Sequence, residues 1–168
     1  MKPETITKQI FKIIPALLLV TLSAFLLQGD VWTFWTWYLL ALVLGTAAIP
    51  LTGRLFRRFQ DRGWMFSKVT AIAVSGFLTW FLVAVKIIKF TTMTCIVVTL
   101  VCAAASLILY CREQKAGFEC IPFAHLDLVY AEELLFFTAF LLWTYFAGFH
   151  PAAYGTEKFM DYGFMEAM

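Results

Sequence analysis

The feature that most constrains this chain is a series of five apolar runs, each close to the length needed to cross a lipid bilayer. A membrane-spanning helix needs about 20 predominantly apolar residues. The runs predict spans at about residues 11–28, 31–50, 69–88, 90–110 and 128–149. Because backbone polar groups inside a bilayer must be satisfied internally, such runs form helices. We therefore expect an all-α membrane protein with five transmembrane helices.

The composition supports this class. Hydrophobic residues make up 62% of the chain and charged residues 14%, whereas soluble domains average about half apolar and a quarter charged. The sequence contains no internal repeat and no linker that would separate domains, so residues 1–168 are expected to form a single polytopic membrane domain. The lipid bilayer is the expected partner, and the net charge of +2 gives no indication of nucleic-acid binding.

The distribution of Lys and Arg predicts the orientation. If the N-terminus is cytoplasmic, ten of the 13 Lys and Arg residues fall in segments on the inside and only Lys86, Lys89 and Lys158 fall outside. An excess of Lys and Arg marks cytoplasmic segments. The pattern therefore predicts a multi-pass protein of the cell membrane with N-in, C-out topology and an extracytoplasmic tail at residues 150–168. The first run is interpreted as an uncleaved span, because the bulky residues at its end do not resemble a signal-peptide cleavage site.

The most basic stretch is residues 53–68, named here the basic segment. It contains Arg54, Arg57, Arg58, Arg62 and Lys68. One interpretation is a cytoplasmic anchor that sets the topology. The other is a cradle for anionic lipid headgroups.

The cysteines, the histidines and the aromatic cluster are interpreted as structural or interfacial residues and not as catalytic residues. Cys95 and Cys102 are interpreted as small packing residues, and His125 and His150 as interfacial residues flanking a span. The aromatic cluster at residues 31–38 is typical of the headgroup level of a membrane. Near the start of the fifth run, Glu132 is expected at the interface.

Glu133 lies beside Glu132 and is open to two interpretations. It is either interfacial or lies inside the membrane. Inside the membrane it needs a partner, for which an arginine of the basic segment is a candidate.

The candidate site lies in the tail, at residues 155–164. Glu157 and Asp161 are four residues apart, so both would point to the same side of a helix. Lys158 lies between them in the sequence. The spacing suits a metal ion or a sugar hydroxyl, and it equally suits a solvated start of a helix.

Two runs of residues resemble a known family. The run Pro50-Leu-Thr-Gly-Arg-Leu-Phe-Arg-Arg-Phe-Gln-Asp-Arg-Gly-Trp-Met-Phe-Ser-Lys68 is similar to a loop of the YYY-type hydrophobic membrane proteins. Further on, Glu133-Leu-Leu-Phe-Phe137 and Gly155-Thr-Glu-Lys-Phe-Met-Asp161 resemble that family's "E-x-L-F" and "G-x-E-K-x-M-D" motifs. The family is grouped with the GT-C membrane glycosyltransferases, which transfer a sugar from a polyprenyl-phosphate donor.

The resemblance implies roles for the tail residues. Asp161 would be the catalytic base or a metal-binding acid, Glu157 its companion, and Lys158 a ligand of the donor phosphate. A divalent cation, Mg or Mn, would be the cofactor.

The sequence departs from the family's pattern in two ways that change the expected function. Phe159 stands where the family usually has proline, and the chain stops before the family's tyrosine triplet. The expected function is therefore that of an N-terminal module, a fragment of a larger GT-C fold. Such a module would be inactive without a partner chain that carries the missing C-terminal half. The alternative is a non-catalytic membrane scaffold or assembly subunit.

Overall fold

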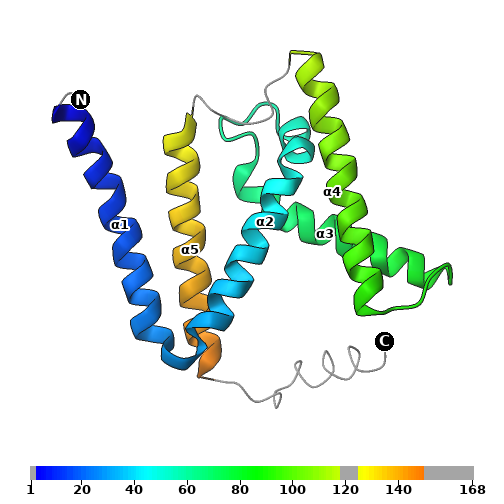
Figure 1. Cartoon of the computed structure of the whole chain (residues 1–168), viewed down its shortest axis with the longest axis horizontal. Coiled ribbons are helices and arrows are strands. Elements are labelled where there is room, and N and C mark those ends of the chain that lie inside the picture. The colour runs from blue at the N-terminus through cyan, green and yellow to red at the C-terminus, as the bar shows by residue number, and fades with distance from the viewer. Residues whose placement is uncertain (1–2, 118–124, 150–168) are drawn as a thin grey trace. The chain divides into compact units, whose positions relative to one another are not determined.

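The computed structural model describes residues 3–117 and 125–149, and it describes side chains from residue 12 onward. The described residues form helices and no strand (Figure 1). The elements are α1 (Pro3–Leu27), the 3₁₀ turn η1 (Gln28–Asp30), α2 (Val31–Leu55), α3 (Trp64–Ala84), α4 (Thr92–Lys115) and α5 (Leu126–Gly148). The all-α prediction is thus confirmed.

The predicted number of spans is wrong. Three stretches are long and apolar enough to cross a membrane among the described residues: Lys12–Leu55, Trp64–Ala84 and Thr92–Lys115. The first two predicted spans fall within the single stretch of 44 residues, where only η1 interrupts the α-helix. The fifth predicted span corresponds to α5, where three carboxylates, Asp127, Glu132 and Glu133, lower the hydropathy.

Two predicted helix ends also differ from the structure. The second span was expected to close at Pro50, but α2 continues to Leu55 with this proline buried inside it. Proline removes only one hydrogen bond of the helix, and membrane helices tolerate this loss when neighbouring groups compensate. The third span was expected from residue 69, whereas α3 begins at Trp64 after a left-handed Gly63. The Asp61 carboxylate accepts a hydrogen bond from the Met65 N–H at 3.4 Å, which favours this early start.

The chain divides into two compact units, each described here by itself. The first consists of the described residues of Met1–Leu39 and Ala131–Pro151, and so contains α1, η1, the first part of α2 and most of α5. The chain reverses direction at η1, where Gln28 has a φ of 43° (Figure 1). Its core is aromatic, with Phe34 and Tyr38 of α2 packed against Phe137 and Leu141 of α5. The aromatic cluster at residues 31–38 therefore builds the interior of this unit, while Trp32 and Trp37 are exposed.

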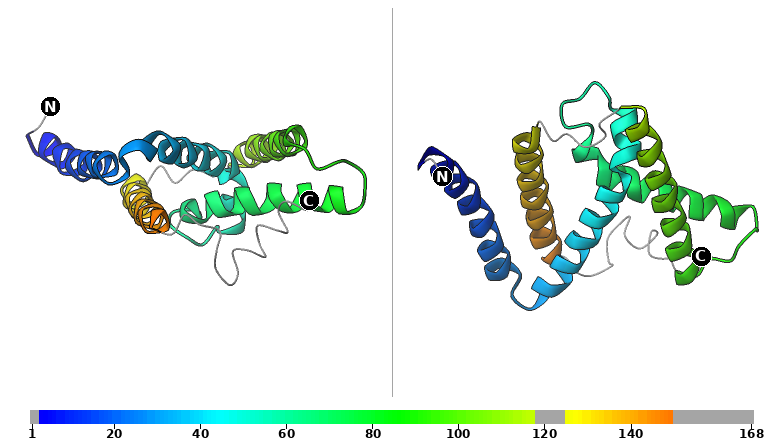
Figure 2. Two further views of the ribbon diagram at one scale, coloured as in Figure 1. Left: turned by 90° about the horizontal axis from the view of Figure 1, so that it is seen from below. Right: turned by 45° about the horizontal axis from the view of Figure 1, so that its top comes forward.

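The second unit covers the described residues of Leu40–Tyr130. It contains the rest of α2 together with α3 and α4, which pack against each other and are joined by residues 85–91 (Figure 2). Buried residues in this unit are mostly small or polar, such as Ala48, Thr52, Ser67 and Ser106. Small residues let membrane helices approach closely, so this composition suits packing inside a bilayer.

Large apolar side chains are exposed along the helices of both units. In water such a surface would be unusual, but in a bilayer the acyl chains cover it. The exposure therefore agrees with a multi-pass membrane protein.

Candidate functional site

The residues predicted to carry chemistry, Asp161, Glu157 and Lys158, lie outside the residues that the structure describes. Their roles as base, companion acid and phosphate ligand, and their fit to a divalent cation, stay predictions. Among residues 3–117 and 125–149, no group of three or more His, Cys, Asp or Glu side chains is placed to hold a metal ion.

Glu133 has a hydrogen-bond partner within the first unit. The Tyr38 hydroxyl donates to Glu133 Oε1 at 2.7 Å, and the tyrosine ring is buried among Phe34, Phe136 and Phe137. A half-buried carboxyl group gains from such a donor, because removing a polar group from water without a hydrogen bond is costly. The sequence pattern placed Tyr38 in an aromatic belt at the headgroup level, which does not indicate this role. The arginine partner suggested for Glu133 stays a prediction.

In the second unit, an ion-pair network connects the C-terminal ends of α2 and α4. Arg54 Nη1 lies 3.5 Å from Glu113 Oε1, and Arg57 Nη2 lies 3.2 Å from Glu113 Oε2. The Glu113 side chain is 13% exposed, whereas Arg54 and Arg57 are 55% and 51% exposed. The carboxylate is therefore largely enclosed, while both guanidinium groups keep an open face.

The basic segment between α2 and α3 is an ordered structure. Three backbone hydrogen bonds form consecutive turns: Phe59 N–H to Phe56 C=O at 3.0 Å, Arg62 N–H to Phe59 C=O at 3.2 Å, and Trp64 N–H to Asp61 C=O at 3.1 Å. The rings of Phe56, Phe59 and Phe66 pack together with centroids 5.1 to 6.5 Å apart. In addition, the Arg62 guanidinium donates to the Arg57 carbonyl at 2.8 Å. These hydrogen bonds and ring contacts therefore fix the backbone of the segment that carries the arginines.

Two charged residues of the basic segment are buried. Lys68 is only 2% exposed, and its ammonium group lies 5.3 Å from the centre of the Trp64 ring, a distance typical of a cation–π contact. The lysine stem packs against Gly45 of α2, where a Cβ atom would come within 2.7 Å of Lys68 Cγ. Asp61 is buried as well. The sequence pattern placed Lys68 in a cytoplasmic anchor, whereas in the structure its stem packs between α3 and α2.

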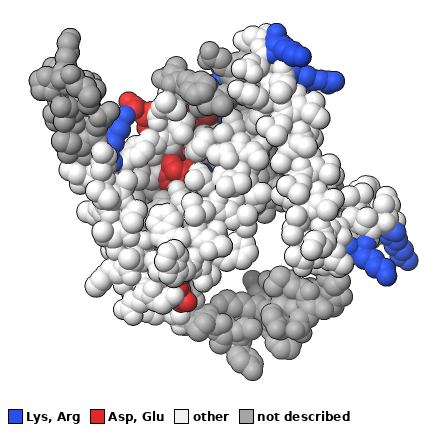
Figure 3. Space-filling model, in the orientation of Figure 1, with Lys and Arg blue, Asp and Glu red and all other residues white. Residues whose placement is uncertain are grey.

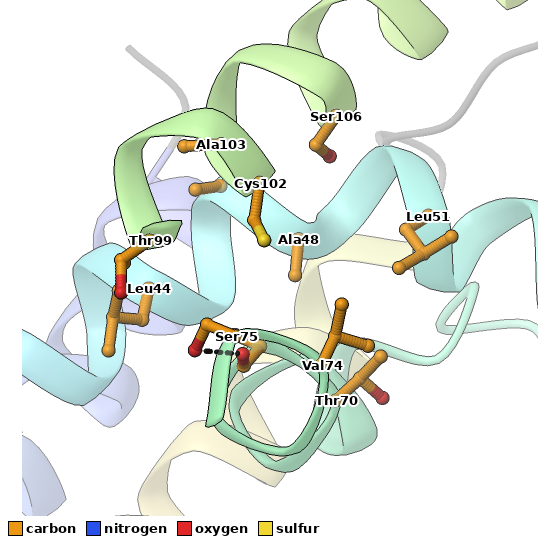
Figure 4. A pocket seen from close by; sticks show the side chains of 12 residues that line it. Leu44, Ala48, Leu51, Thr70, Val74, Ser75, Thr99, Cys102, Ala103 and Ser106 are labelled. Atoms are coloured by element: carbon orange, nitrogen blue, oxygen red, sulfur yellow. Dashed lines mark hydrogen bonds between the residues drawn. The ribbon is translucent and has the colours of Figure 1, made fainter. Parts of the chain in front are cut away.

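A small crevice lies between α2, α3 and α4, lined by Ala48, Val74, Ser75, Cys102 and Ser106 among others (Figure 4). Its volume is about 50 Å³. The Ser106 hydroxyl is 6% exposed and has no hydrogen-bond partner among the described residues, whereas the Ser75 hydroxyl donates to the Ala71 carbonyl at 2.8 Å. The crevice exceeds the ~10–15 Å³ that a water molecule occupies, so it suits a water molecule bound to Ser106.

On the right of Figure 3, Lys and Arg side chains form two separate patches with an uncharged surface between them. The end shared by α2 and α4 carries six cations and two carboxylates, and the connection between α3 and α4 carries two lysines. The six cations are Arg54, Arg57, Arg58, Arg62, Arg112 and Lys115, and the two carboxylates are Asp61 and Glu113. Apolar helices with charged ends are the pattern of an integral membrane protein.

Comparison with known families agrees with this class. Residues 74–168, more than half of the chain, match the family of uncharacterized membrane proteins DUF2298, and the chain belongs to this family. The resemblance to hydrophobic membrane proteins is thereby confirmed at the level of a membrane protein family. No curated protein matches the chain, and no solved structure matches it.

Proposed function

We propose that the chain is a membrane module of a GT-C-type glycosyltransferase that uses a polyprenyl-phosphate sugar donor and acts together with a partner chain. The extent of the family match carries the proposal. Residues 74–168 include the runs 133–137 and 155–161, which resemble motifs of the YYY-type proteins. The acidic tail therefore belongs to the part of the chain that matches its membrane protein family.

The proposed chemistry assigns one role to each tail residue. Asp161 accepts the proton of the acceptor hydroxyl, whose oxygen then attacks the sugar carbon while the bond to the donor phosphate breaks. A positioned carboxylate is the usual group for this proton transfer. Glu157 supports Asp161, and Lys158 compensates the charge that develops on the phosphate. A divalent cation, Mg or Mn, would bind to the oxygen atoms of these carboxylates.

The test is sugar transfer by the full chain, co-purified with its partner and reconstituted in lipid vesicles. The probe is a polyprenyl-phosphate hexose with a radiolabelled sugar, and the readout is label transferred to the lipid or protein acceptor. Replacing Asp161 by Asn should lower the rate by about 10²-fold or more, because the proton acceptor is lost. Glu166→Gln is the matched control, since it removes one negative charge from the same tail, and its rate should be unchanged. A wild-type rate in the Asp161→Asn variant would contradict the proposal.

A scaffold is the second candidate function. Trp143 and Phe146 of α5 and Phe25 of α1 are exposed, and these apolar surfaces suit packing against a partner helix. A scaffold would recruit its partner without contributing a proton acceptor. It predicts that Asp161→Asn co-purifies with the partner and leaves the activity of the assembly unchanged.

A further inference from the structure

We propose that Arg54, Arg57 and Arg58, named here the arginine cluster, bind the phosphate of an anionic phospholipid headgroup. This inference does not depend on the proposed function, whose candidate residues lie in the tail. Four observations carry it: the position of the cluster, its rigidity, the chemistry of its ion pairs and its apolar surroundings.

The cluster lies where two apolar helices end together. The ion pairs of Arg54 and Arg57 with Glu113 connect the ends of α2 and α4, so both helices reach the membrane interface at the same end of the second unit. Residues 54–62 and the last turn of α4 together contain six cations and two carboxylates. Anionic lipid headgroups are concentrated at this level of a bilayer, and clusters of basic residues beside a span attract them.

The cluster is held in place before any ligand binds. Arg57 and Arg58 lie in the turn closed by the hydrogen bond from Phe59 N–H to Phe56 C=O. The rings of Phe56 and Phe59, which bound this turn, pack together with the ring of Phe66. The Arg57 carbonyl is further fixed by the guanidinium of Arg62. A ligand that binds a fixed site avoids the entropic cost of ordering a flexible loop. The basic segment therefore has the rigidity expected of a binding site.

Glu113 orients two guanidinium groups without enclosing them. Each arginine faces one oxygen of this carboxylate and keeps about half of its side chain exposed, at 55% for Arg54 and 51% for Arg57. A guanidinium group has five N–H donors in a planar fork that matches the oxygen atoms of a phosphate. In this arrangement Glu113 also competes with the phosphate for the same positive charge, and this competition makes the carboxylate a useful test residue.

The residues beside the cluster favour a lipid over a soluble phosphate. Leu55, Phe59 and Phe66 are exposed next to the arginines. Exposed apolar side chains beside cations suit a molecule with an anionic head and acyl chains. A site for free phosphate or a soluble nucleotide would gain nothing from this surface.

The experiment measures the affinity of the full chain, in nanodiscs of phosphatidylcholine, for a fluorescent phosphatidylglycerol. The double variant Arg54→Gln/Arg57→Gln should bind this lipid about tenfold more weakly, because each basic residue near the surface contributes to headgroup attraction. Glu113→Gln should bind it more tightly, by about threefold, because the competing negative charge is removed while the amide oxygen can still accept a hydrogen bond from an arginine. The matched control Lys86→Gln/Lys89→Gln removes two cations from the other end of α4 and should leave the affinity unchanged.

The outcomes separate the alternatives. An unchanged affinity in the double arginine variant, or a weaker affinity in Glu113→Gln, would overturn the proposal. Two competition results would overturn the assignment to a phospholipid. One is displacement of the fluorescent lipid by inorganic phosphate at concentrations similar to those at which unlabelled phosphatidylglycerol displaces it. The other is displacement by polyprenyl phosphate at lower concentrations than by phosphatidylglycerol. If the double variant does not fold, Arg58→Gln tests the same site, because its guanidinium takes no part in the ion pairs with Glu113. A loss of affinity in Arg58→Gln supports the site and an unchanged affinity overturns it.

Discussion

The Tyr38 hydroxyl and the Glu133 carboxylate form a side-chain hydrogen bond between α2 and α5 within the first unit. The two residues are 95 positions apart in the sequence. Around them the core consists largely of aromatic rings. Such a bond both satisfies the carboxyl group and fixes how α2 and α5 pack.

Replacing Tyr38 by Phe should destabilise the chain by about 1–2 kcal/mol, because the half-buried Glu133 carboxylate loses a hydrogen-bond donor. The measurement is the free energy of unfolding in mixed detergent micelles. Tyr145→Phe is the control, since the Tyr145 ring contacts Phe146 and Phe149 and should keep these contacts without its hydroxyl.

A double-mutant cycle of Tyr38→Phe and Glu133→Leu separates this hydrogen bond from the other contacts of Glu133, and its coupling energy should be about 1 kcal/mol. If Tyr38→Phe alone is as stable as the wild type, the hydrogen bond does not stabilise this unit.

At the level of elements, the two glycines with the same backbone angle differ in their surroundings. Gly63 and Gly117 both have a φ of 76°, which side chains of L-residues rarely adopt. A Cβ atom at Gly63 would lie 2.6 Å from Phe56 Cδ2, whereas nothing lies within 4 Å of one at Gly117. An alanine at Gly117 therefore introduces backbone strain alone, whereas an alanine at Gly63 introduces the same strain and a steric clash.

Gly117→Ala should cost about 1–2 kcal/mol, the cost of a left-handed backbone for a residue with a Cβ atom. Gly63→Ala should cost more, because it also displaces Phe56 from the ring cluster under the basic segment. Unfolding in detergent micelles measures both, and equal losses would show that Phe56 moves aside freely.

The helices follow from the sequence because long apolar runs in a bilayer have no other backbone structure open to them. Their ends were harder to predict, since the local signals at Pro50 and Gly63 depend on what packs beside them. The partners of Glu133 and Glu113 could not be predicted at all. The sequence around Tyr38 or Arg57 does not indicate which distant carboxylate each side chain contacts, because tertiary packing decides the pairing. For Lys68, burial against Gly45 and Trp64 likewise became visible only in the structure.

At the scale of the whole molecule, the described residues contain three stretches able to cross a membrane. The contacts of Glu113 place the ends of α2 and α4 together, and residues 85–91 lie at the other end of α4. These relations place the basic segment and the connection between α3 and α4 at opposite ends of α4.

Cysteine labelling in sealed vesicles tests this arrangement. In a variant without the native cysteines, Arg58→Cys and Lys115→Cys should react with a membrane-impermeant maleimide from the same side, and Lys86→Cys from the opposite side. If the predicted orientation is correct, only Lys86→Cys reacts from outside in right-side-out vesicles. Labelling of all three positions from one side would contradict the crossing of α3 and α4.

The first unit is assembled from both ends of the described chain, with α1 and the start of α2 packed against α5. A ribosome makes α2 long before it makes α5, so the aromatic core that contains the N-terminal helices is completed only after the second unit has been synthesised. During that interval Tyr38 has no Glu133 to bind. The helix α1 and the start of α2 are therefore translated before the second unit but reach their final packing after it.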